Sequence, residues 1–232
     1  PHEGSALLLQ QGGVFGVRDE RRRGTGAYLA FGYVGSRRGE PDEHYDRLTV
    51  SGGLRAAFLD ERLRVDVALE VPDDTQHGAG WAAASSLLLD GPMVGLAIEV
   101  GAWVPFSDQA EAGAARLAPS ADLSLLIGRR VTMRTRQGAL VDLESGGARL
   151  WSSAYGLDVW AVGPLSAGAE VILAVGVAQD RLVVAPAAAI GVSLRLSIVT
   201  ASFVGRYGFT TDAAELLGQY SAMATVRVSA FE

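Results

Sequence analysis

The segment Leu63–Val71 alternates without a break between two kinds of side chain. Its odd-numbered positions are all Leu or Val, whereas its even-numbered positions are Arg64, Asp66, Ala68 and Glu70. A period of two is typical of a β-strand whose two faces meet different surroundings. Here one face is purely aliphatic and the other carries charges of both signs. A sheet built from such strands needs an apolar medium on one side and a polar medium on the other.

The same alternation recurs along most of the chain and predicts about twelve strands, each long enough to cross a bilayer. The expected ranges are Thr25–Gly35, Arg47–Leu59, Arg62–Val71, Gly80–Leu89, Met93–Phe106, Leu117–Gly128, Arg130–Val141, Arg149–Val162, Gly168–Val177, Arg181–Val192, Arg195–Phe209 and Leu216–Phe231.

The composition is apolar, with 20% charged residues and a mean hydropathy of +0.21. No stretch approaches the ~18 uncharged apolar residues of a membrane helix. The apolar residues are dispersed in alternation, as they are where only half of each strand faces lipid. We therefore expect an all-β fold, a closed antiparallel up-and-down transmembrane β-barrel of about 12 strands (range roughly 10–14), with a polar lumen.

The connections between the expected strands alternate in length, as they do between the two sides of an outer-membrane barrel. Short turns are expected at Asp60-Glu61, Asp90-Gly91-Pro92, Gly128-Arg129, Gly163-Pro164-Leu165 and around Ser193. Longer polar loops are expected at Ser36–Asp46, Pro72–Gly78, Ser107–Arg116, Glu144–Ala148 and Thr210–Glu215, and only Gln179-Asp180 is short for its place. A soluble β-sandwich, the alternative fold, has no reason to sort its turns in this way, and its strands are usually shorter.

The chain divides into an N-terminal segment, residues 1–24, and the barrel, residues 25–232. The first segment can be periplasmic, a plug of the lumen or an extra strand. Because an exported barrel needs a signal peptide and none is visible at Pro1-His2-Glu3, we expect the signal to have been removed from this chain.

The polar face of the strands is expected to line the lumen. Its charged residues are Arg55, Arg64, Asp66, Glu70, Asp122, Arg134, Arg136, Asp158, Glu170, Arg206 and Arg227. The same face is expected to carry the small residues Ala84, Ala97, Gly101, Ala174, Gly176, Ala185, Ala187 and Ala189, which leave room in the bore.

Aromatic residues lie towards strand ends, where outer-membrane barrels carry interfacial belts. The expected belt is Phe58, Trp81, Phe106, Trp151, Tyr207 and Phe209. By parity, Trp103 and Trp160 face inward unless a bulge intervenes.

The last strand alternates at Tyr220, Ala222, Ala224, Val226, Val228 and Ala230 before Phe231 and Glu232. Together with the alternating strands and the sorted connections, this last strand gives a resemblance over nearly the whole chain: the protein resembles bacterial outer-membrane β-barrel proteins of the porin-like kind. The resemblance is architectural. Such proteins usually end on an aromatic residue that the insertion machinery reads, whereas Phe231 here is off the parity of its strand. The resemblance implies the outer membrane of a Gram-negative bacterium, with lipid and lipopolysaccharide as partners and other envelope proteins as further candidates.

Motifs for chemistry are mostly missing. The three histidines are His2, His44 and His77, and only His77, beside Asp73 and Asp74, offers a rim site for general acid–base work. No phosphate loop, HExxH motif or EF-hand loop is present, so we expect no enzyme, no cofactor and no resident metal. The net charge of -6 argues against nucleic-acid binding.

The expected lumen charges suggest two functions. A track of arginines could line a narrow porin-like channel for small or anionic solutes. Alternatively, the arginines and carboxylates could pair and seal the bore, leaving a closed structural or anchoring barrel in a cell-envelope complex such as a secretion or motility machine. A ring of about twelve strands, between the filled eight-stranded and the open sixteen-stranded barrels, allows either function.

Overall fold

The computed structural model describes residues 25–37, 45–59, 62–72, 79–91, 93–105, 115–127, 130–162, 164–178, 181–217 and 219–229. Within these ranges it contains twelve strands and one short helix, α3, which spans Thr211–Leu217. The strands are β1 Gly26–Ser36, β2 Tyr45–Phe58, β3 Leu63–Pro72, β4 Ala79–Asp90, β5 Val94–Pro105, β6 Arg116–Ile127, β7 Val131–Asp142, β8 Ala148–Val162, β9 Leu165–Ala178, β10 Arg181–Leu196, β11 Val199–Gly208 and β12 Tyr220–Ser229.

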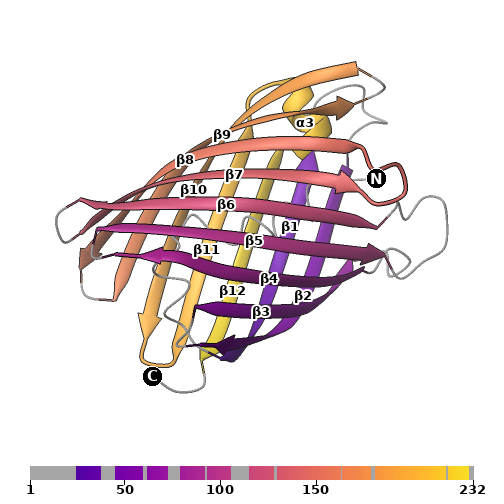
Figure 1. Ribbon diagram of the computed structural model, residues 1–232. Coiled ribbons are helices and arrows are strands. Elements are labelled where there is room, and N and C mark those ends of the chain that lie inside the picture. Colours follow the sequence, from indigo (N-terminus) through magenta and orange to yellow (C-terminus); the bar gives the residue numbers. More distant parts are fainter. Residues whose placement is uncertain are drawn as a thin grey trace.

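The twelve strands form a single closed antiparallel barrel (Figure 1). Each strand pairs with its neighbours in sequence, and β1 pairs with β12 from Gly26 opposite Ser229 to Gly35 opposite Tyr220. This last pairing closes the ring, so each of the twelve strands has a partner on both sides. The expected fold class, including the strand number, is confirmed.

The alternation in the sequence separates an outer face from an inner one. On β3, the outward residues Val67 and Leu69 are 48% and 58% exposed, whereas Asp66, on the inward row of the same strand, is 5% exposed. The outward aliphatic residues are exposed because no other part of the protein covers them, which is the arrangement expected of a surface that contacts lipid. Among the described residues, no helix is long and apolar enough to cross a membrane.

The barrel has one end with short connections and one with longer connections, except that β9 and β10 are joined at the second end by residues 179–180 alone, as the sequence indicated. The short connections are residues 59–62, 91–93, 128–130, 163–164 and 197–198, and the β1 start and the β12 end lie at the same end of the barrel. The turn expected around Ser193 lies instead at Ser197 and Ile198, because β10 continues to Leu196. Ser197 has a φ of 50°, the left-handed conformation that a two-residue hairpin turn requires.

The connection between β11 and β12 differs from the expected loop Thr210–Glu215 and from the expected strand start at Leu216. Residues Thr211–Leu217 form α3, and the backbone N–H of Ala213 donates to Thr210 Oγ1 at 3.1 Å, as at a helix N-cap. Helix α3 packs on β9, β10 and β11, and Ala213, Leu216 and Leu217 are buried. Figure 1 shows α3 at one end of the ring, beside β9.

The register of the sheet tests the side-chain directions that were expected for Trp103, Ala84 and Trp160. Trp103 lies on the inward row of β5 with Gly101, and its pairs with β4 and β6 contain no bulge near it. The expectation that Ala84 faces the lumen is wrong. Ala84 pairs with Val65 and Val100, which are both exposed on the outside of the barrel. Trp160 pairs with Ser166 on the inward row of β9, and the bulge in the β8–β9 pairing comes after it, between Trp160 and Val162.

We predict that an outward charge in the middle of a strand destabilises the barrel. Val67→Arg should lower the free energy of unfolding in lipid by about 2–4 kcal/mol, because hydrocarbon cannot solvate the guanidinium group. Val67→Ala, the control, removes the same side chain without adding charge and should cost less. Urea titration of barrels folded into liposomes, followed by tryptophan fluorescence, measures both. Equal losses for the two variants would mean that this face does not meet hydrocarbon.

Candidate functional site

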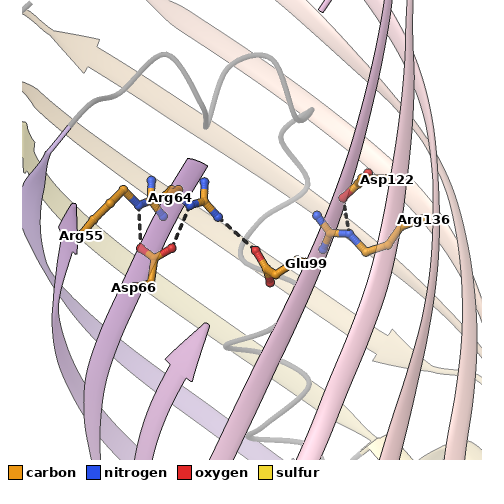
Figure 2. A network of polar contacts seen from close by, with 6 residues as sticks. All are labelled: Arg55, Arg64, Asp66, Glu99, Asp122 and Arg136. Atoms are coloured by element: carbon orange, nitrogen blue, oxygen red, sulfur yellow. Dashed lines mark hydrogen bonds and ion pairs between the residues drawn. The ribbon is translucent and has the colours of Figure 1, made fainter. Parts of the chain in front are cut away.

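Inward charges on β2, β3 and β5 form a connected chain of ion pairs (Figure 2). Asp66 forms ion pairs with two arginines: Arg55 Nε donates to its Oδ1 at 2.6 Å, and Arg64 Nε lies 2.8 Å from its Oδ2. Arg64 extends the chain to β5, where its Nη2 lies 3.1 Å from Glu99 Oε2. The side chains of Arg55 and Asp66 are 7% and 8% exposed, so this network lies inside the barrel.

A second group of ion pairs lies on β6 to β9. Arg136 Nε is 2.6 Å from Asp122 Oδ2, a pair that Figure 2 shows beyond Glu99. Arg134 Nη2 is 2.7 Å from Glu170 Oε2, and its Nε is 3.7 Å from Asp158 Oδ2. The two groups face the same lumen and together extend from β2 to β9.

Small residues let these pairs span two strands. Arg64 and Glu99 are separated in the ladder by Ser85, and Arg134 and Glu170 by Gly156. A Cβ at position 156 would lie 3.1 Å from Arg134 Nε and 3.1 Å from Glu170 Cβ. The glycine therefore leaves the space through which the guanidinium group reaches its carboxylate. Buried charges are tolerated when they are paired and hydrogen-bonded in this way.

The opposite wall of the lumen has a different charge. The inward rows of β10, β11, β12 and β1 carry Arg195, Arg206 and Arg227 and, within the described residues, neither Asp nor Glu. Arg227 lies over the ring of Tyr28, 5.8 Å from its centroid. The Tyr28 ring in turn covers Gly53, where a Cβ would approach it to 2.6 Å. Across the lumen, Arg116 lies 5.7 Å from the centroid of Trp103.

Helix α3 narrows the lumen at the end with the longer connections. Leu216 and Leu217 belong to an inward apolar cluster with Leu140, Leu150, Ile172, Ala174, Val183 and Ala185. A Cβ at Gly176 would lie 3.0 Å from Leu150 and 3.2 Å from Leu216, so this glycine accommodates the helix. An Nη of Arg206 donates to the carbonyl oxygen of Leu217 and ties the end of α3 to β11. Arg181 and Asp212 add an exposed ion pair at 3.0 Å.

The residues expected in the lumen lie as follows. Arg55, Arg64, Asp66, Asp122, Arg134, Arg136, Asp158, Glu170, Arg206 and Arg227 lie on inward rows, and all except Arg206 and Arg227 take part in the ion pairs described above. For Glu70 the structure describes the backbone, paired with Ser51 and Ala79, but not the side chain. The expected segment 1–24, His2, His44 and His77 lie outside the described residues.

Sequence reasoning did not single out Glu99, Arg116 or α3. The parity of β5 contained the signal for Glu99, which stands between Ala97 and Gly101 on the same face. Arg116 was assigned to a loop because β6 begins one residue earlier than expected. Within the described ranges, no group of three or more His, Asp or Glu side chains is arranged to hold a metal ion.

The expected aromatic belt is partly described. Phe58, Trp151, Tyr207 and Phe209 are exposed on the outside, and the rings of Tyr207 and Phe209 lie 5.8 Å apart. Phe106 lies outside the described residues, and for Trp81 only the backbone is described, opposite Ala68 and Trp103.

A further cluster joins β1, β2 and β12 on the outer surface at the long-connection end. The rings of Tyr33 and Tyr220 stack with centroids 5.8 Å apart, and the hydroxyl of Tyr33 and the guanidinium of Arg37 both donate to Asp46. The backbone N–H of Arg37 donates to Gln219 Oε1 at 2.7 Å. This cluster links both sides of the seam where the barrel closes.

No protein-family model matches the chain, and no curated protein matches it. Solved structures do. The KdgM porin in complex with disordered oligogalacturonate superimposes with a TM-score of 0.60 at 10% identity, over 89% of this chain and 99% of that one. The NanC porin gives 0.60 at 9% identity, over 88% and 100%. An outer-membrane channel from Pseudomonas putida F1 gives 0.62 at 10% identity, over 88% and 95%. The chain thus has the fold of bacterial outer-membrane β-barrels, as the sequence resemblance implied.

We predict that Asp66 is required for the stability of the inward network. Asp66→Asn should lower the free energy of unfolding by about 3 kcal/mol, because it leaves two buried guanidinium groups without their shared carboxylate. In the double variant Arg55→Gln/Asp66→Asn part of this loss should return. Denaturant titration of the four proteins of this double-mutant cycle measures the coupling. Arg37→Gln, which removes an exposed ion pair with Asp46, is the control and should change stability less. Additive losses would contradict a buried, coupled pair.

Proposed function

We propose that this protein is a narrow, non-enzymatic diffusion channel of the Gram-negative outer membrane, for small anionic solutes. The outward aliphatic rows would contact outer-membrane lipid, and the aromatic side chains at the long-connection end would lie among the headgroups of lipopolysaccharide. The lumen would connect the two sides of this membrane.

The cationic wall carries the proposal. Arg195, Arg206 and Arg227 follow one another along β10, β11 and β12, whereas the described inward carboxylates all lie on β3 to β9. A path beside the cationic wall has a positive potential and therefore attracts anions, since selectivity in pores follows the charged side chains that line them. The KdgM porin, a structural neighbour, is described with oligogalacturonate, which is a carboxylated sugar chain. Carboxylated sugars are accordingly the first solutes to test.

The channel must be narrow. Twelve strands enclose less space than the sixteen of open porins. The described inward side chains are buried or only partly exposed, and α3 occupies part of the cross-section. Single-channel conductance should therefore be well below that of a general porin.

We predict that the protein conducts with a preference for anions. In planar bilayers under a KCl gradient, the reversal potential should have the sign of chloride permeation. Arg195→Gln/Arg227→Gln should bring the chloride-to-potassium permeability ratio towards one, because it removes two lumen charges without touching the anchor of α3. Arg37→Gln, on the outer rim, is the matched control and should leave the ratio unchanged. A cation preference, or an unchanged ratio in the double variant, would overturn the anionic assignment.

A closed structural barrel is the second candidate, and the burial of the inward side chains favours it. The contact of α3 with β9, β10 and β11 would then be part of the seal. Such a barrel could anchor partners in a cell-envelope complex through its loops.

We predict that the two candidates separate in a variant of α3. Leu216→Asp places a carboxylate in an apolar cluster and should release the helix from the wall. If the protein is a channel, the wild type conducts and this variant conducts more. If the barrel is closed, the wild type is silent although it migrates as a folded barrel in unheated gels. The exposed substitution Asp212→Asn controls for a general effect on the helix and should leave conductance as in the wild type.

A further inference from the structure

We infer that the outward surface of β7 and β8 around Gln137 is the site at which a second copy of this chain binds within the membrane. The inference concerns the outside of the barrel, and it is independent of whether the lumen conducts.

The outward rows are apolar almost throughout, and their polar exceptions gather in one place. Away from strand ends, the described outward residues that are polar and not aromatic are Ser86, Thr135, Gln137 and Ser153. Three of these four are adjacent: Gln137 lies opposite Ser153, and Thr135 is the next outward residue on β7. Gln137 is in the middle of β7, at the depth where the surrounding bilayer is hydrocarbon.

The side chain of Gln137 is only half satisfied. The hydroxyl of Ser153 donates to its Oε1 at 2.6 Å, and this is its one side-chain hydrogen bond within the described part of the chain. The NH2 group of the same carboxamide carries two donors, and both need an acceptor in the surroundings of the barrel. Turning the amide round would only exchange which end lacks a partner. Lipid tails offer neither donor nor acceptor, so an amide in this position is costly unless another polar group covers it.

The surroundings of Gln137 suit close contact with another protein. Ala121 lies opposite Gln137 on β6, and Ala139 follows it on β7, so the backbone there can be approached closely. Trp151 and Tyr155 flank the polar patch on β8 with 52% and 59% of their surfaces exposed. Tryptophan and tyrosine are enriched at protein–protein contacts.

A second copy satisfies this patch with the groups that the chain itself provides. A carboxamide is self-complementary, because it carries both a donor and an acceptor. A two-fold axis beside β7 would place Gln137 of one copy against Gln137 of the other, so that each NH2 group meets an oxygen. Such a contact is isologous and stops at the dimer. A lipid could not supply these groups.

Cysteine cross-linking tests the contact directly, because the natural chain contains no cysteine. Ala139→Cys, at the next outward position on β7, gives a single thiol beside the patch and keeps Gln137. Phe31→Cys, also outward and in the middle of a strand, gives a matched control on β1, which is six strands away in either direction around the ring. Both full-length variants are folded into liposomes and oxidised at increasing lipid-to-protein ratios.

We predict that the thiol at position 139 forms a disulfide-linked dimer about tenfold more than the control does. This dimer should persist on dilution with lipid. Equal cross-linking at both positions, or loss of the dimer on dilution in step with the control, would overturn the inference.

The same surface can be tested without cross-linking. Gln137→Leu removes the reason for the contact while keeping an outward residue that suits lipid, so folding should not suffer. Sedimentation equilibrium in mild detergent should show a dimer for the wild type and a shift towards monomer for Gln137→Leu. A monomeric wild type, or a dimer that this substitution leaves unchanged, would reject a second copy as the occupant.

Discussion

Hydrocarbon cannot hydrogen-bond to a peptide group, and this constraint determines the rest of the structure. An open sheet would leave two edges of N–H and C=O groups without partners in the membrane. The pairing of β1 with β12 removes both edges. The same seam carries, on the outer surface, the Tyr33 and Tyr220 rings, Asp46 and Arg37, which connect three strands at the long-connection end. Side-chain contacts are therefore added where the chain must bring its first and last strands together.

Closure also explains why the charges are where they are. Once the ring is complete, each strand has one row facing lipid and one facing the interior, and a charged residue can be accommodated only in the second row. The inner rows then bring many ionic groups into a small volume. From β2 to β9 each arginine of the network lies beside a carboxylate, with Ser85 and Gly156 as spacers between partners on alternate strands. The spacers show that the network depends on the small residues as much as on the charges.

Much of this could be predicted from the sequence, because alternation is a local property. The order of residues within a single strand indicates its two faces, as it does in Leu63–Val71. The strand number and most strand ranges could therefore be predicted from this alternation. The ion pairs could not be predicted, because Arg64 and Glu99 meet only through the register of three strands. Helix α3 was missed for a similar reason. Leu216 and Leu217 look like the start of a strand, and only the apolar surface of Leu150 and Ile172, brought close by the barrel, makes a seven-residue helix stable there. Ala84 was misplaced because the run of three alanines around it contains no alternation from which its direction could be read.

The two polar exceptions to the overall pattern differ in what they imply. On the inside, the arginines of β10 to β12 are separated from the carboxylates of β3 to β9, so the lumen has a cationic side along which an anion could move. On the outside, Gln137, Thr135 and Ser153 interrupt an aliphatic surface at a depth where lipid cannot satisfy them. The first exception concerns what passes through the barrel and the second what stands beside it. Because successive residues of a strand point to opposite sides of the wall, Arg136 faces the lumen and Gln137 the membrane, and β7 contributes to both surfaces without either constraining the other.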